Sequence, residues 1–165
     1  MKKLLAVTAV LLTASLPSAF AQNSAKGSWR FDAAQSDFGS QPKPKSMHLV
    51  ITKDTPEMLA WHLTEVNAEG KTTTEAWSGA KDGTMHPIKG SEQGGQASFQ
   101  GSDSDLTINE KMASGGSAVS HVSMSDNGTT MTEHLTGTDK SGNQFTQTIV
   151  WHKVTGTKKA AKAAK

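Results

Sequence analysis

The chain of 165 residues contains no cysteine, no tyrosine and a single arginine, Arg30. The absence of cysteine excludes disulfides, thiolate metal ligands, a cysteine nucleophile and lipid attachment at a cysteine. A single arginine argues against a nucleic-acid groove, because such grooves gather arginine and lysine along one face. The longest mostly apolar run, at residues 4–16, is too short to span a bilayer as a helix, which takes roughly 20 residues.

The first 21 residues have the organisation of a signal peptide. Lys2 and Lys3 precede the apolar run, and Ala19 and Ala21 supply the small residues that signal peptidase requires. We therefore expect cleavage after Ala21 and export to the periplasm or the medium of a bacterium, the alternative being an uncleaved membrane anchor. Cleavage removes two of the 17 basic residues and leaves 15, equal to the 15 acidic residues.

The rest of the chain is long enough for one domain and ends in a short basic tail. We predict a single domain over residues 22–157, whose core is large enough to fold without disulfides. Residues 158–165 contain only lysine and alanine, so we expect a disordered tail. Such a tail either stays solvated or contacts anionic lipid or cell-wall polymer.

Short stretches with alternating apolar and polar residues recur from residue 26 to residue 154, and turn-forming clusters separate them. This pattern is typical of β-strands joined by hairpins, and no stretch has the 3.6-residue period of an amphipathic helix. The predicted strands are residues 27–32, 45–53, 58–66, 71–79, 84–89, 96–101, 105–112, 118–125, 129–138 and 144–154.

The predicted fold is therefore an all-β antiparallel meander that closes into a barrel of about 8–10 strands. A β-sandwich is the alternative, since both arrangements avoid exposed sheet edges. The regular hairpin spacing favours the barrel, because a sandwich needs longer crossover connections.

The start of the first predicted strand, Gly27-Ser28-Trp29, resembles the Gly-x-Trp signature of lipocalins and other calycins. Together with residues 36–38 and 42–46 and the later turns, it is similar to secreted bacterial lipocalin-like β-barrel proteins. The resemblance implies that Trp29 closes one end of the barrel, and it implies no particular activity. The Thr-Asp-Tyr motif and the late arginine of the classical family are missing, and Lys153 is the residue available to replace that arginine.

The alternation also places carboxylates among apolar residues, at Glu65, Glu75, Glu110 and Glu133. A charge on an apolar face is expensive to bury, so these groups lie near water, in pairs, or in a solvated cavity. A lumen with such walls suits a small apolar or amphipathic molecule, including a cationic one, and such a molecule is the ligand we expect. The candidate ligand-binding residues are Trp61, Glu75, Trp77, Met131, Glu133 and Ile149.

No motif supports a metal site, a cofactor or a catalytic nucleophile. The histidines have no close spacing, so we expect His48, His62, His121, His134 and His152 to be separate and exposed on the outer face. A hydrolase or isomerase would need at least two of the four carboxylates to converge with a histidine. The leading hypothesis is an exported small-molecule binding protein. The rival is an envelope structural or interaction protein with a filled barrel.

Overall fold

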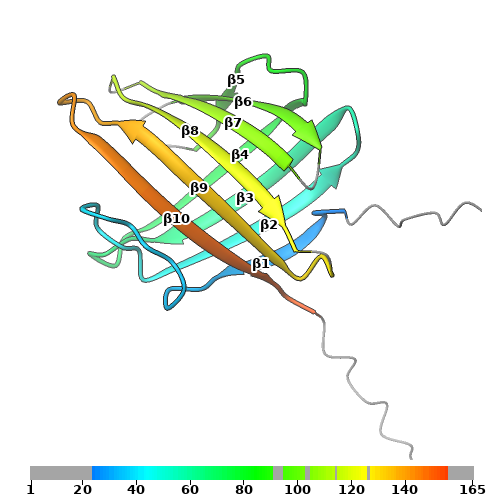
Figure 1. Cartoon of the computed structure of the whole chain (residues 1–165), viewed down its shortest axis with the longest axis horizontal. Helices are drawn as coiled ribbons and strands as arrows, with labels where there is room; N and C mark the ends of the chain where they lie inside the picture. The colour runs from blue at the N-terminus through cyan, green and yellow to red at the C-terminus, as the bar shows by residue number, and fades with distance from the viewer. Residues whose placement is uncertain (1–23, 91–94, 103–104, 114, 126, 156–165) are drawn as a thin grey trace, which may run out of the picture.

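The computed structural model describes residues 24–90, 95–102, 105–113, 115–125 and 127–155. These residues form ten β-strands and no helix (Figure 1). In chain order the strands are β1 Gly27–Phe31, β2 Ser46–Asp54, β3 Met58–Val66, β4 Thr72–Ala80, β5 His86–Ile88, β6 Gly95–Ser102, β7 Asp105–Met112, β8 Ser117–Met124, β9 Thr130–Thr138 and β10 Gln144–Lys153. The described residues thus contain no apolar helix of membrane-spanning length.

All ten strands belong to one antiparallel sheet in the order β4-β3-β2-β1-β10-β9-β8-β7-β6-β5. Every neighbour in this order except the β1–β10 pair is also a neighbour in sequence, as expected for a meander. The sheet curls until its two edge strands approach each other, so it forms a nearly closed barrel (Figure 1). The predicted all-β barrel is confirmed. The predicted signal peptide, residues 1–21, and the predicted tail, residues 158–165, lie outside the described residues.

Nine predicted strands match the observed bounds to within one residue at each end. The exception is the strand predicted at residues 84–89, which is shortened to His86–Ile88. Pro87 lies at its centre and has no N–H to donate to a ladder, so proline is confined to edge strands such as this one. The connection from β4 to β5 is consequently looser than the predicted hairpin.

The barrel closes through two backbone hydrogen bonds between Ala76 of β4 and Lys89, just after β5. The amide of each residue donates to the carbonyl of the other, at 2.9 Å and 2.8 Å. Gly90 follows with a φ of +81°, where a Cβ would collide with the carbonyl oxygen of Thr74. A glycine is therefore required at this position for the two edges to approach so closely.

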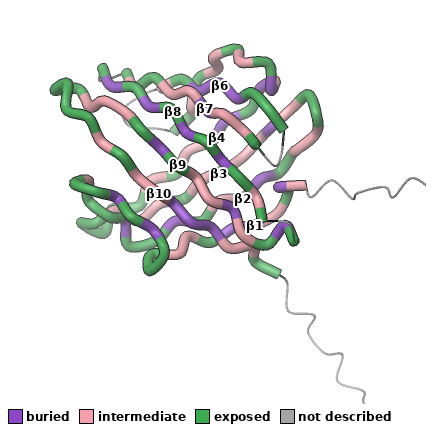
Figure 2. Tube along the Cα trace, in the orientation of Figure 1, coloured by how far each residue is buried: buried purple, intermediate pink, exposed green. Residues whose placement is uncertain are grey.

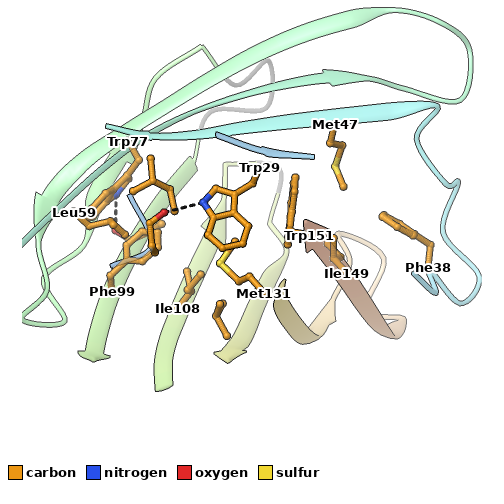
Figure 3. Close-up of a cluster of buried hydrophobic side chains, with 14 residues drawn as sticks. Trp29, Phe38, Met47, Leu59, Trp77, Phe99, Ile108, Met131, Ile149 and Trp151 are labelled. Carbon is orange, nitrogen blue, oxygen red and sulfur yellow. Dashed lines mark hydrogen bonds between the residues drawn. The ribbon is translucent and has the colours of Figure 1, made fainter. Parts of the chain in front are cut away.

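The core occupies the interior of the barrel, and β8 shows the underlying alternation most clearly, with exposed and buried residues following one another (Figure 2). Trp29 has no exposed surface, and its indole N–H donates to the carbonyl of Ala25 at 2.7 Å. Figure 3 shows Trp29 near the middle of the buried cluster, with Phe99 on one side of it and Phe38 on the other. The side chains of opposite strands meet here, so much of the interior is filled.

Lys153 of β10 packs over Trp29, with Nζ 5.2 Å from the ring centroid, and donates to the carbonyl of Ser24 at 3.0 Å. Lys153 therefore contacts Trp29, and its equivalence to the lipocalin arginine stays a prediction. The role of Trp29 in closing the barrel stays a prediction.

Candidate functional site

The barrel encloses a cavity of about 120 Å³ toward the end at which β1 begins and β10 ends. Its walls are mainly apolar and come from strands all around the barrel, and four of its lining residues are ionisable. The lining residues are Ala25, Leu49, Ile51, Asp54, Leu59, Trp61, Lys81, Phe99, Leu106, Ile108, Glu110, Val122, Met131, Glu133 and Trp151. An engineered apolar cavity of about 150 Å³ binds benzene, so a ligand of this cavity has to be compact.

Two of the ionisable residues neutralise each other. The Lys81 ammonium forms a short ion pair with the Asp54 carboxylate, 2.5 Å apart, and both side chains are almost fully buried. Asp54 also accepts a hydrogen bond of 2.7 Å from the amide of Ala25, which lies two positions before β1. A buried ion pair survives only when its geometry and remaining hydrogen bonds are good, and both conditions hold here.

The other two ionisable lining residues, Glu110 and Glu133, are acids on the inward face of β7 and β9. Burial raises the pKa of Glu110 to about 7, helped by repulsion from Glu133 and from Glu75. Burial also raises the pKa of Glu133. Both side chains nevertheless keep some accessible surface, because they face the cavity. At neutral pH the Glu110 carboxyl group is therefore divided between its neutral and charged forms.

The Glu133 carboxylate is surrounded by hydrogen-bond donors that are not fully used. The Ser120 hydroxyl and the Trp151 indole N–H oppose the rise in its pKa, so both favour its ionised form. Neither donor makes a hydrogen bond of normal length and angle with any described residue, although Ser120 has no exposed surface and Trp151 is 4% exposed. An unmet buried donor typically costs about 1–3 kcal/mol, so these two groups favour an acceptor beside them, either the ionised Glu133 carboxylate or a ligand atom.

Two more carboxylates approach the lumen on the other side of the barrel. Glu65 of β3 and Glu75 of β4 are half-buried, and burial followed by repulsion from Glu75 raises the pKa of Glu65. The charge of Glu75 also raises the pKa of Glu110, so carboxylates on different walls of the lumen repel each other. The alternation in the sequence had placed all four carboxylates on the inner face, and this arrangement agrees with it.

Of the six residues predicted to bind a ligand, Trp61, Met131 and Glu133 line the cavity. Trp77 is 2% exposed and Ile149 is 8% exposed, and both belong to the surrounding core. The Trp77 indole N–H donates to the carbonyl of Ala97 at 3.1 Å, which holds this ring against β6. Glu75 is half-buried and does not line the cavity, but its charge raises the pKa of Glu110, which does.

Among the ionisable and hydroxyl-bearing residues of this site, sequence reasoning did not choose four as binding residues. Asp54 and Lys81 stand at strand ends, where charged residues are usually solvated, and only the three-dimensional arrangement shows that they pair. Ser120 alternates with Ala118 and Val122, so its inward position was readable from the strand pattern. The fourth, Glu110, was recognised as inward-facing but was not chosen as a binding residue.

The histidines divide into two groups. His48, His62, His121 and His134 are exposed, as predicted, whereas His152 is only partly exposed and its Nε2 donates to the Asp32 carboxylate at 3.1 Å. His86, which the sequence analysis did not consider, is different: its Nε2 is buried and finds no partner in the described part of the chain. It packs edge-on against Trp77, with 5.7 Å between the ring centroids. Residues 24–155, apart from the undescribed gaps, contain no metal-like cluster of side chains.

A second depression opens where β9 turns into β10, at the end of the barrel opposite the start of β1. It has a volume of about 630 Å³. Its lining residues are Gln41, Met112, Leu135, Asp139, Lys140, Ser141, Phe145 and Gln147. None of them carries a buried unpaired group, so the cavity inside the barrel is the better candidate site.

Comparison with known proteins does not assign the chain to a family. No protein-family model matches the chain, and no curated protein matches it. Among solved structures, the complex of EF1p2_mFAP2b with DFHBI is similar to 81% of this chain and 99% of that chain, with 11% sequence identity and a TM-score of 0.48. A likeness this distant bears on neither the family nor the ligand.

Proposed function

We propose that the protein is an exported, lipocalin-like small-molecule binding protein whose ligand is compact and amphipathic and lies in the enclosed cavity. The observation that carries this proposal is the combination of apolar walls with buried donors that lack a partner, at Ser120 and Trp151. Ligand sites are usually apolar hollows with a few convergent polar groups, and this cavity has that composition.

The cavity volume limits the ligand. Pockets for drug-sized molecules occupy roughly 300–1,000 Å³. A volume of about 120 Å³ accommodates a single small ring or a short branched chain. Fatty acids and haem are therefore unsuitable probes, and molecules close to benzene in size are the appropriate ones.

The small volume also supports the second candidate, an envelope structural or interaction protein whose barrel is filled by side chains. Trp29, Trp77 and Phe99 already occupy much of the interior. In that case the cavity holds only water, and its polar groups complete their hydrogen bonds with that water. Ligand titration separates the two functions.

The titration uses toluene, benzyl alcohol, benzylamine and benzoate and follows the fluorescence of Trp61 and Trp151, which line the cavity. Saturable binding of at least one probe supports the proposal, and absence of saturation with all four contradicts it. Val122→Phe fills the cavity and is expected to abolish binding. The matched control is Val119→Phe on the outward face of the same strand, where the side chain is 37% exposed.

Export is proposed from the organisation of residues 1–21. Mass spectrometry of the protein from fractionated bacterial cells tests it, because cleavage after Ala21 removes a defined mass. Recovery of the intact chain from the cytoplasm alone would contradict export and would leave the cavity proposal to its own test.

A further inference from the structure

We propose that the enclosed cavity selects a small organic cation, with an ammonium group beside Glu110 and Glu133 and an apolar body against the ring of Trp61 or Trp151. This inference rests on the proposed binding function and names the chemical class of its ligand. The charges of the cavity wall and the hydrogen-bond donors next to Glu133 both favour such a ligand.

The wall has an excess of acid. Among the described residues that line the cavity, Lys81 is the only cation, and it is held by Asp54. Glu110 and Glu133 therefore face the same small space with no cation of the protein in that lining. When both are ionised the wall carries two uncompensated negative charges, and Glu75 adds repulsion from β4. An ammonium group in the cavity is the simplest neutralising partner.

The donors around Glu133 provide an independent reason. The Ser120 hydroxyl and the Trp151 indole N–H are deeply buried, lack a full hydrogen bond, and favour the ionised form of Glu133. An ammonium in the cavity draws Glu133 into that ionised form, which gives both donors an anionic acceptor. The cation and the two donors then act together on a single carboxylate, and charge-assisted hydrogen bonds of this kind are the strong ones.

The aromatic wall favours the same ligand class. Trp61 and Trp151 both contribute to the lining, and the face of an indole ring attracts a cation more strongly than other aromatic faces do. An anionic ligand of the same size would be repelled by Glu110 and Glu133. A neutral ligand would leave the negative charges of the two carboxylates uncompensated.

Binding of a cation is expected to release a proton. The groups that act on Glu110 are Glu133 from β9 and Glu75 from β4, and the buried Asp54–Lys81 pair completes the charges of the cavity wall. Because the pKa of Glu110 is about 7 in the free protein, this carboxyl is mostly protonated at pH 6. A bound ammonium lowers that pKa, so affinity rises from pH 6 to pH 8 and a proton leaves on binding at pH 6.

The test is calorimetric titration of the full chain with benzylamine, benzyl alcohol and benzoate, which share a ring and differ in charge. Benzylamine is expected to bind at least about tenfold more tightly than benzyl alcohol at pH 8, and benzoate is not expected to bind. At pH 6, titration in buffers of different ionisation enthalpy should show proton release with benzylamine and none with benzyl alcohol.

Glu110→Gln and Glu133→Gln are each expected to weaken benzylamine binding about tenfold while changing benzyl alcohol binding less than about threefold. Glu69→Gln, at an exposed turn position, is the matched control and is expected to change neither. Benzyl alcohol binding as tightly as benzylamine, or benzylamine binding that is unaffected by both glutamine variants, would overturn the cation inference while the binding function stands. No saturable binding of any probe would overturn both.

Discussion

Glu110 makes the stability of the barrel depend on pH in a direction opposite to that of most acidic residues. Its pKa is raised by folding from an ordinary value of 4.5 to about 7, so the folded state binds the proton more tightly than the unfolded state does. The resulting stability is fully present below pH 4.5 and is lost as pH rises to about 7. Glu133 and Glu65, whose pKa values are also raised, act in the same direction.

The size of the effect follows from the interval between the two pKa values of Glu110. At about 1.4 kcal/mol for each pKa unit, the rise from 4.5 to about 7 corresponds to about 3 kcal/mol of stability lost by pH 8. This is a large part of the 5–15 kcal/mol that typically separates folded and unfolded domains. Glu110→Gln keeps a neutral group at all pH values, so it should raise stability at pH 8 by about 3 kcal/mol and change it little at pH 4.5.

Urea unfolding of the purified protein, followed by tryptophan fluorescence at half-unit steps from pH 4.5 to 8.5, measures both effects. The three aspartates with lowered pKa, Asp32, Asp82 and Asp139, titrate below this range and do not disturb it. A wild-type protein as stable at pH 8 as at pH 5 would refute the burial of these acids. So would a Glu110→Gln variant that is no more stable than the wild type at pH 8.

Three further substitutions test other parts of the structure by urea unfolding. Lys81→Met leaves the buried Asp54 carboxylate without its ammonium and should cost about 3–5 kcal/mol, and a loss below about 1 kcal/mol would show that the pair is solvated. Gly90→Ala should cost more than Gly142→Ala: both positions have positive φ, at about 1–2 kcal/mol each, but only at Gly90 does the new Cβ meet another strand. Lys153→Met removes the cation from the tryptophan face and should cost about 1 kcal/mol at low salt, and an unchanged midpoint would argue against that contact.

The fold was predictable because this barrel is built almost entirely from local rules. Period-two alternation and turn residues set nearly every strand, and hairpins between consecutive strands fix the sheet order. The short β5 departs from the prediction because Pro87 limits its ladder, which the sequence already contained. Among the described strands, β1 with β10 is the one ladder that does not join consecutive strands, and it follows from the closure of the meander.

The site was predictable only in part, because alternation tells which face a side chain occupies and not how far it lies from others. The alternation placed Glu110 and Glu133 on the inner face. It could not show whether they lie at a solvated end of the barrel or in an interior cavity, because that depends on how the strands are staggered relative to one another. Asp54 is the last residue of β2, and Lys81, 27 positions later, directly follows β4. The alternation within a strand does not predict an ion pair between two such strand ends. No periodic signal connects such positions.

Asp54 has a cationic partner within the chain, whereas Glu110 and Glu133 have none in the described lining. This difference indicates that a ligand binds beside the two glutamates. The Asp54 carboxylate has an ammonium and a backbone amide, so its burial is compensated within the chain. Glu110 and Glu133 have no ammonium in the described lining, and the Ser120 and Trp151 donors beside Glu133 lack a hydrogen-bond partner, so apolar residues of similar size would make the barrel more stable. Residues that reduce stability are typical of functional sites, where a bound molecule supplies the missing partner. If Glu110→Gln both raises stability at pH 8 and weakens benzylamine binding, then the Glu110 carboxyl group lowers the stability of the free protein and is needed to bind the ligand.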